Sequence, residues 1–267
     1  MREKIKSLVI ADVIFIALLT VSGMINGVLS NIVYFSAFII PFLFVVIAEK
    51  IDIKSKEYLF PLKNPDIAAA GVFPTLITVI VISTLTASLM SLFGKENTVE
   101  LGDSLALALL THALLPAVLE EGLFRYIPMK LLAGRNGRVC VLISAILFSL
   151  AHHSLFSIPY AFIAGVAFMT IDIVSGSVLP SLVMHLVSNA LSVVLMFYPV
   201  TAPLSTAIYS VISVLACLSL IYLIVIRERA ARIISERFVT LEKYKFSYEI
   251  LLYAVPMLVI SVSELLI

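Results

Sequence analysis

Nine long apolar segments divide this chain of 267 residues. A helix that crosses a bilayer needs roughly 17–25 mostly apolar residues, and most of these segments reach that length. The fifth segment is short for a span, and the ninth contains a proline and a glutamate. We therefore predict a polytopic all-α transmembrane bundle of eight spans, or nine if the last segment also crosses. The segments cover residues 7–29, 31–48, 67–93, 104–127, 139–152, 158–175, 179–198, 203–226 and 249–266.

The composition favours a membrane protein over a soluble one. Hydrophobic residues make up 61% of the chain and charged residues 13%, whereas soluble domains have about 45–50% and 25%. So few charges cannot cover a surface that faces water. The net charge of +1 argues against a nucleic-acid partner and leaves membrane lipids as expected neighbours. No linker separates a soluble domain, so we predict a single transmembrane domain over 1–267, with the motif-bearing core at 104–198.

The basic residues predict the orientation of the chain in the membrane. All 18 lysines and arginines except Lys95 fall into groups at 2–6, 50–63, 125–138 and 227–245, which alternating passes place on one side. The positive-inside rule makes that side cytoplasmic, so we expect a cytoplasmic N-terminus. The basic segment 50–66 has two interpretations, a solvated loop or an interfacial stretch that lies on the headgroups.

Ionisable residues inside the apolar segments are the main clue to function. A charged group at the bilayer centre costs about 2.5–3.5 kcal/mol on insertion scales, so it is rarely kept without a use. We expect the two buried aspartates to cap or pair within the bundle. The intramembrane candidates are Asp12, His112, Glu120, Glu121, Arg125, His152, His153, Asp172, His185 and Glu264.

The fourth apolar segment contains two adjacent glutamates, Glu120 and Glu121. Arg125 follows Glu121 by four residues, so both lie on one helix face and can form an ion pair. Glu120 lies about 100° around the helix and has no intrahelical cation. An unpaired buried carboxylate is a candidate general base, although a helix end with interfacial charges is the alternative. Pro128 predicts the end of this helix.

Two later segments each contain a histidine with a partner four residues away. Phe148 precedes His152 near the end of the fifth segment, and Asn189 follows His185 in the seventh. Each histidine alone could equally well pack against its neighbours, join helices by hydrogen bonds or carry protons.

Position in the chain relates Glu120 to His152. Both lie 16 residues from Asn136, the centre of the turn GRNGR. Equal offsets in an antiparallel hairpin predict that the two side chains lie at the same depth. His185 lies nine residues after Gly176, so straight helices would place it nearer the cytoplasm than Glu120, whereas a tilted or short sixth helix would close that gap.

Three motifs occur in order on successive segments: E-E-x-x-x-R at 120–125, F-x-x-x-H at 148–152 and H-x-x-x-N at 185–189. This pattern resembles the CPBP family, which comprises type II CAAX prenyl proteases and bacteriocin-processing enzymes and is also called the ABI family. The resemblance implies an intramembrane endopeptidase that acts near the cytoplasmic side. Its substrate would be a prenylated CAAX peptide or a small signalling peptide. We expect a multi-pass protein of a prokaryotic plasma membrane.

The resemblance also implies roles for the motif residues. Glu120 and His152 would activate a water, while His185 and Asn189 would stabilise the oxyanion. Amide hydrolysis requires such a base and such donors, and no serine or cysteine nucleophile with an adjacent base is apparent. The expected supporting residues are Glu121, Arg125 and Phe148.

Other chemistry and other functions remain open. His152, His185 and Glu120 are residue types that bind zinc, but H-E-x-x-H is absent and Asn189 would be a poor ligand, so we expect no cofactor. A non-catalytic membrane regulator or immunity protein on the same scaffold is the first alternative, against which the complete motif set argues. A proton-coupled transporter is the second, although the sequence shows no inverted repeat.

Overall fold

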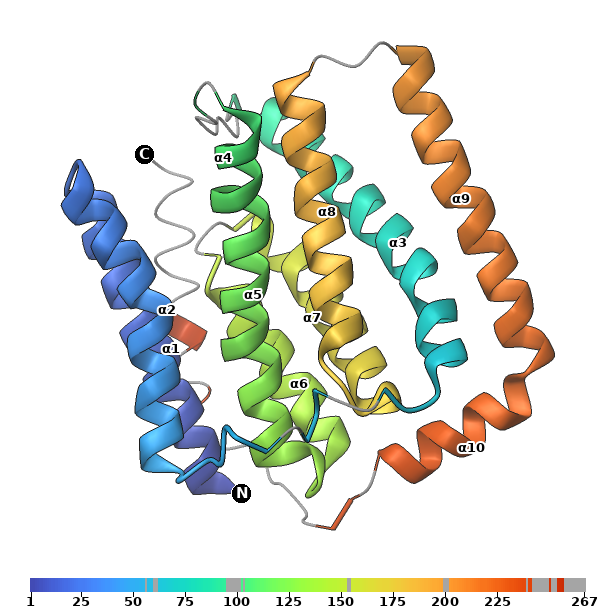
Figure 1. The fold of residues 1–267 in the computed structure, drawn as a ribbon, viewed down its shortest axis with the longest axis horizontal. Helices are drawn as coiled ribbons and strands as arrows, with labels where there is room; N and C mark the ends of the chain where they lie inside the picture. Colours follow the sequence, from blue (N-terminus) through green and yellow to red (C-terminus); the bar gives the residue numbers. More distant parts are fainter. Residues whose placement is uncertain are drawn as a thin grey trace.

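The computed structural model is a bundle of helices that run up and down past one another (Figure 1). It describes residues 1–55, 57–59, 62–94, 102, 104–152, 155–198, 202–238, 240–241, 250 and 254–256. Seven helices in these ranges are long and apolar enough to cross a membrane. This confirms the polytopic all-α fold. Most of segment 249–266 lies outside the described residues, so a ninth span stays a prediction.

The helices follow the predicted segments closely. Residues Leu105–Ala133 form one long apolar helix, in which α-helical turns alternate with three wider π-helical segments. The elements are α1 (Arg2–Met24), α2 (Val28–Ala48), α3 (Pro65–Leu92), α4 (Leu105–Leu109), η1 (Leu110–Leu114), α5 (Leu115–Glu121), η2 (Gly122–Tyr126), η3 (Met129–Ala133), α6 (Gly137–Leu150), α7 (Ser157–Ser175), α8 (Leu179–Phe197), α9 (Ala202–Val225) and α10 (Arg227–Arg237).

The arrangement places α5 and α8 near the middle of the bundle. The α1–α2 hairpin lies on one side, and α9 lies at the opposite edge beside α3 (Figure 1). Large apolar side chains on α9, such as Leu218 and Ile224, are exposed. A soluble protein would not leave such a surface in water, whereas lipid tails cover it at no cost. The short α6 has 14 residues and a length of about 21 Å, so it ends inside the bundle.

Ionic and hydrogen-bonding contacts hold the α9–α10 corner against the start of α3. Arg229 donates from its two terminal nitrogens to the carboxylate of Asp66 at 2.7 and 3.1 Å. The Tyr222 hydroxyl donates to the same carboxylate at 2.8 Å. Paired contacts of this kind fix the geometry of a guanidinium against a carboxylate, so they anchor an edge helix that buries little surface elsewhere.

Pro128 does not end the fourth span, contrary to the prediction. The helix continues through η3 to Ala133. Proline has no N–H, so the carbonyl of Phe124, four residues earlier, loses its usual donor. The hydroxyl of Ser144 on α6 donates to that carbonyl at 2.5 Å, and Arg125 donates to it from Nη1 at 3.2 Å. The proline therefore creates an acceptor that helps to hold Arg125.

The segment between α2 and α3 packs against the α7–α8 turn, and its two interpretations, a solvated loop or an interfacial stretch, stay predictions. Its described residues form backbone hydrogen bonds with the α7–α8 turn. The amide of Lys63 donates to the Ser175 carbonyl at 2.7 Å, and the amide of Val178 donates to the backbone carbonyl of Tyr58 at 2.9 Å. Ser175 and Ser177 in that turn are fully buried. The α7–α8 turn thus lies inside the bundle, with this segment packed against it.

We expect cysteines placed at Lys54 and Arg135 to react from the same side of the membrane. The positive-inside rule predicts that this side is cytoplasmic, and Lys130, near the turn at Arg135, donates to Ser55 at 3.2 Å. Labelling intact and permeabilised cells with an impermeant maleimide tests the orientation, in a background with Cys217 replaced by serine because that thiol is exposed. Labelling of position 135 from outside intact cells would contradict it.

Candidate active site

Glu120 and Glu121 are the last residues of α5 and lie between two π-helical segments. Such segments are rare and often mark functional sites in helices. Glu121 is 1% exposed, whereas the side chain of Glu120 keeps 18% of its surface accessible. The two adjacent carboxylates therefore have different surroundings, one enclosed and one facing open space.

Glu121 lies between a guanidinium and an imidazole. Its Oε2 atom is 3.4 Å from Nε of Arg125, so the structure contains the ion pair that the i, i+4 spacing predicted. Its Oε1 atom is 2.8 Å from Nδ1 of His185 on α8. Glu121 thus connects its own helix to the helix that contains the third motif.

Arg125 is fully buried and is covered by aromatic rings. Its guanidinium carbon lies 4.3 Å from the ring centroid of Phe148 and 5.8 Å from that of Phe168. Nη1 also donates to Ser144 at 3.3 Å. A buried ion pair is stable only when further hydrogen bonds and close packing offset its desolvation, and these contacts supply both.

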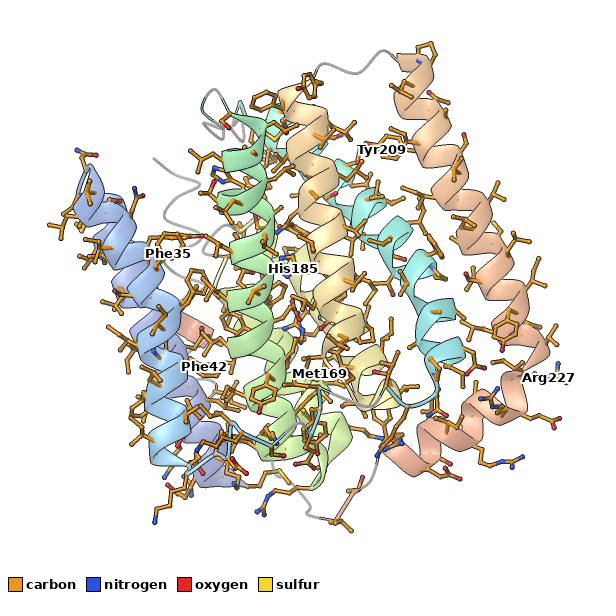
Figure 2. The ribbon with its side chains drawn as sticks, in the orientation of Figure 1. Phe35, Phe42, Met169, His185, Tyr209 and Arg227 are labelled. Atoms are coloured by element: carbon orange, nitrogen blue, oxygen red, sulfur yellow. The ribbon has the colours of Figure 1, made fainter. Side chains whose placement is uncertain are left out.

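His185 lies in the middle of the bundle, beside α5 (Figure 2). An ionised Glu121 can only accept a hydrogen bond, so Nδ1 of His185 must donate to it. The other nitrogen, Nε2, is 3.8 Å from Oε2 of Glu120. His185 therefore faces both carboxylates.

His185 lies level with the glutamates and not nearer the cytoplasm, as straight helices would place it, for two reasons. The α7–α8 turn is buried within the bundle, so α8 starts at a deeper level than the turn at Asn136. The helix between Glu121 and that turn also includes η2 and η3, and a π-helical turn takes up more residues than an α-helical one. Both features bring His185 level with the glutamates.

His152 follows α6, where the last carbonyls of the helix have no helical donors. Its backbone amide donates to the Ser149 carbonyl at 3.3 Å. Its ring Nδ1 donates to the Phe148 carbonyl at 2.8 Å. The neutral ring therefore has an unprotonated Nε2. Its ring packs edge-on against Phe148, with centroids 4.8 Å apart, so the F-x-x-x-H spacing fixes both the tautomer and the orientation of the histidine.

One cavity of about 190 Å³ brings the four predicted catalytic residues together. Glu120, His152, His185 and Asn189 all contribute to its walls, and three serine hydroxyls add further polarity. We call it the polar cavity. Its remaining lining residues are Val79, Ser83, Phe148, Tyr160, Ala164, Phe168, Ser188 and Ser192.

The part of the chain that contains the site matches the model of a known family. Residues 102–191 match the model of the family described as "Type II CAAX prenyl endopeptidase Rce1-like". Over this stretch the chain is similar to type II CAAX prenyl endopeptidases. The match contains all three motifs and every residue predicted for the site. No match was found among curated proteins or solved structures.

Within the Rce1-like stretch, Asp172 has a structural role that the sequence only outlined. It is fully buried, and its Oδ1 accepts from the backbone amide of Ser181 at 3.1 Å. Ser181 lies in the first turn of α8, where amides have no helical acceptor. The prediction that Asp172 caps a helix is confirmed, and the helix it caps is the one that contains His185.

Sequence reasoning missed two other contributors to the site. Ser144 bonds both the Phe124 carbonyl and Arg125, and the ring of Tyr160 packs against His152 with centroids 5.9 Å apart. Neither is an ionisable residue in a motif, so only the packing of α6 and α7 identifies them. His112 lies in η1 and does not line the polar cavity. His153 and Glu264 are outside the described residues.

In the alternative of a zinc site, His152, His185 and Glu120 are the residues that would hold the ion. Among the residues that the structure describes, no three side chains of His, Cys, Asp or Glu are grouped so as to hold a metal ion. The chelator assay proposed below measures whether hydrolysis depends on a metal.

Proposed function

We propose that this chain hydrolyses a peptide bond within the membrane, using a water activated by Glu120 and His152. The family is one of endopeptidases. The observation that carries the mechanism is the convergence of Glu120, His152, His185 and Asn189 on one polar cavity. Its volume of about 190 Å³ leaves room for a water and the backbone of a substrate.

In the proposed first step, the water donates one hydrogen bond to Glu120 and the other to Nε2 of His152. A lone pair on its oxygen then attacks the carbonyl carbon, and Glu120 accepts the proton that the water loses. The carbonyl double bond opens to give a tetrahedral oxyanion. The proton next passes from Glu120 to the amide nitrogen, the C–N bond breaks, and a carboxylic acid and an amine leave.

Asn189 and His185 are the proposed donors to the oxyanion. The side-chain amide of Asn189 can donate in any state of the site. His185 uses its Nδ1 proton on Glu121, so it donates from Nε2 only as an imidazolium. A cation in a buried site requires a nearby negative charge. The carboxylates of Glu120 and Glu121 lie beside the His185 ring and supply that charge. Donors aimed at an oxyanion typically contribute about 10²–10³ in rate each.

The proposed substrate is a peptide that reaches the cavity from the membrane or its cytoplasmic face. The family description supports a prenylated CAAX terminus, and a small unprenylated peptide is the other class considered. Incubating the purified protein with matched prenylated and unprenylated peptides, and analysing products by mass spectrometry, tests both. Cleavage of neither class by active-site-intact protein would favour a non-catalytic regulator or immunity protein.

A proton-coupled transporter is the second alternative. Buried glutamates and histidines are also common in transporters. However, Nδ1 of His152 and Nδ1 of His185 each contact a fixed acceptor, which suits a site that must hold its groups still. Proton uptake by reconstituted vesicles, without any peptide product, would favour the transporter.

We expect hydrolysis to continue in a strong chelator. If Glu120 and His152 hold the water without a metal, removal of trace zinc should change the turnover rate by less than about twofold, far below the roughly 10²-fold or greater effect of losing a catalytic group. Assays with and without EDTA or phenanthroline, together with elemental analysis, measure this. Loss of activity that added zinc restores would instead assign the water to a metal.

A further inference from the structure

A second cavity meets the polar cavity at the catalytic pair. Glu120 and His152 line both cavities, so their side chains form a shared wall. The second cavity has a volume of about 200 Å³. We call it the aromatic cavity, and its other lining residues are Phe15, Leu19, Tyr34, Phe38, Phe124 and Ala151.

The two cavities differ in chemistry. Serines, an asparagine and a histidine line much of the polar cavity, whereas the aromatic cavity is lined mainly by rings and aliphatic groups from α1, α2 and η2. A peptide group needs hydrogen-bond partners, and an apolar side chain needs none. A substrate that crosses the shared wall would therefore place its reacting carbonyl on the polar side and a side chain on the other.

The aromatic rings that line the aromatic cavity pack against one another. Phe15 packs edge-on against Phe38 and Phe124, with centroids 4.9 and 5.5 Å apart, and Tyr34 packs against Phe38 at 5.4 Å. Rings interlocked in this way cannot move independently. This packing limits the size of the cavity, so the cavity can discriminate between side chains of different size.

The volume indicates what the aromatic cavity can hold. Pockets for small-molecule ligands usually measure about 300–1,000 Å³, and a volume of about 200 Å³ is smaller. A space of this size suits one leucine or phenylalanine side chain better than a long prenyl chain.

We infer that the aromatic cavity is the subsite for an apolar side chain of the substrate residue beside the cleaved bond. The inference rests on the proposed hydrolysis at Glu120 and His152. Helices α1 and α2 lie outside the Rce1-like stretch. The inference gives both helices a direct part in selecting the substrate.

Leu19 is the residue best suited to test this subsite. It lines the cavity without belonging to the interlocked rings, and it is only partly buried, so its replacement should preserve the fold. Leu19→Phe fills the cavity and Leu19→Ala enlarges it. Val21 is 46% exposed on the same helix and lines neither cavity, so Val21→Phe is the matched control.

The assay uses ten-residue glycine–serine peptides with one central alanine, leucine or phenylalanine. One methylene in an apolar pocket changes discrimination by about 10–200-fold. The ratio of kcat/KM for the phenylalanine peptide to that for the alanine peptide should therefore fall at least about tenfold in Leu19→Phe. The same ratio should rise in Leu19→Ala and stay at the wild-type value in Val21→Phe.

Binding measurements separate this inference from the proposed function. In Glu120→Gln, which should not hydrolyse peptide, the phenylalanine peptide should raise the melting temperature more than the alanine peptide does. Adding Leu19→Phe should remove that difference. Equal shifts with both peptides, or ratios unaffected by both Leu19 variants while hydrolysis still depends on Glu120, would overturn the subsite and leave the hydrolytic mechanism standing. Absence of hydrolysis of both prenylated and unprenylated peptides by the wild type would contradict the mechanism alone, since the binding comparison still decides the subsite.

Discussion

Glu120→Gln should reduce peptide hydrolysis to the uncatalysed background while the protein inserts, purifies and melts like the wild type. Glutamine keeps the shape of the side chain but cannot accept a proton from water. Among the described residues, the ion-pair partner of the Glu120 carboxylate is Nε2 of His185, at the long distance of 3.8 Å. The fold therefore loses little when the charge is removed.

The neighbouring glutamate provides a matched control for this experiment. Glu121→Gln removes the charge that faces Arg125 at 3.4 Å and His185 at 2.8 Å, so it should lower the melting temperature, which Glu120→Gln should leave unchanged. Product formation by mass spectrometry and thermal melting in detergent measure the two effects on the same samples. Hydrolysis by Glu120→Gln at the wild-type rate would show that the proposed mechanism is wrong.

Arg125→Ala should impair folding far more than Asn189→Ala does. Removing one partner of a buried ion pair leaves the other charge uncompensated and typically costs about 3–5 kcal/mol. Arg125 is fully buried, so no water replaces its contacts with Glu121, Ser144 and the Phe124 carbonyl.

Asn189→Ala should have the opposite profile. Asn189 lines the polar cavity and is only partly buried, and we assign it a donor to the oxyanion. Its loss should lower the rate by about 10²–10³ with little change in stability. Expression level, melting temperature and kcat/KM of the two purified variants distinguish the roles. Similar melting temperatures for both variants, or normal turnover by Asn189→Ala, would count against the assignment.

Local spacing predicted the parts of the site that depend on one helix. The four-residue interval between Glu121 and Arg125 gives their ion pair, and that between Phe148 and His152 gives the ring contact and the bond from the histidine to the Phe148 carbonyl. The equal offsets of Glu120 and His152 from Asn136 agree with their place in the wall of the same cavities.

Features that depend on how helices end and dock could not be predicted in this way. The sequence suggested a stop at Pro128, but the orphaned carbonyl of Phe124 finds a donor in Ser144, so the helix continues. The level of His185 depends on the buried α7–α8 turn and on contacts with the segment around Tyr58. These are long-range contacts, and periodicity within one helix carries no information about them.

The ring of Phe148 has contacts on several sides. The guanidinium of Arg125 lies over it at 4.3 Å, and the rings of His152 and His185 approach it edge-on, with centroids 4.8 and 6.1 Å away. A shift of this ring would therefore change the packing against the Arg125–Glu121 ion pair and, at the same time, the orientation of both histidine rings. Substitutions at these positions should then be energetically coupled, because residues that share a packing partner do not respond independently. In this site the same aromatic side chain links the stability of the fold to the alignment of the reacting groups.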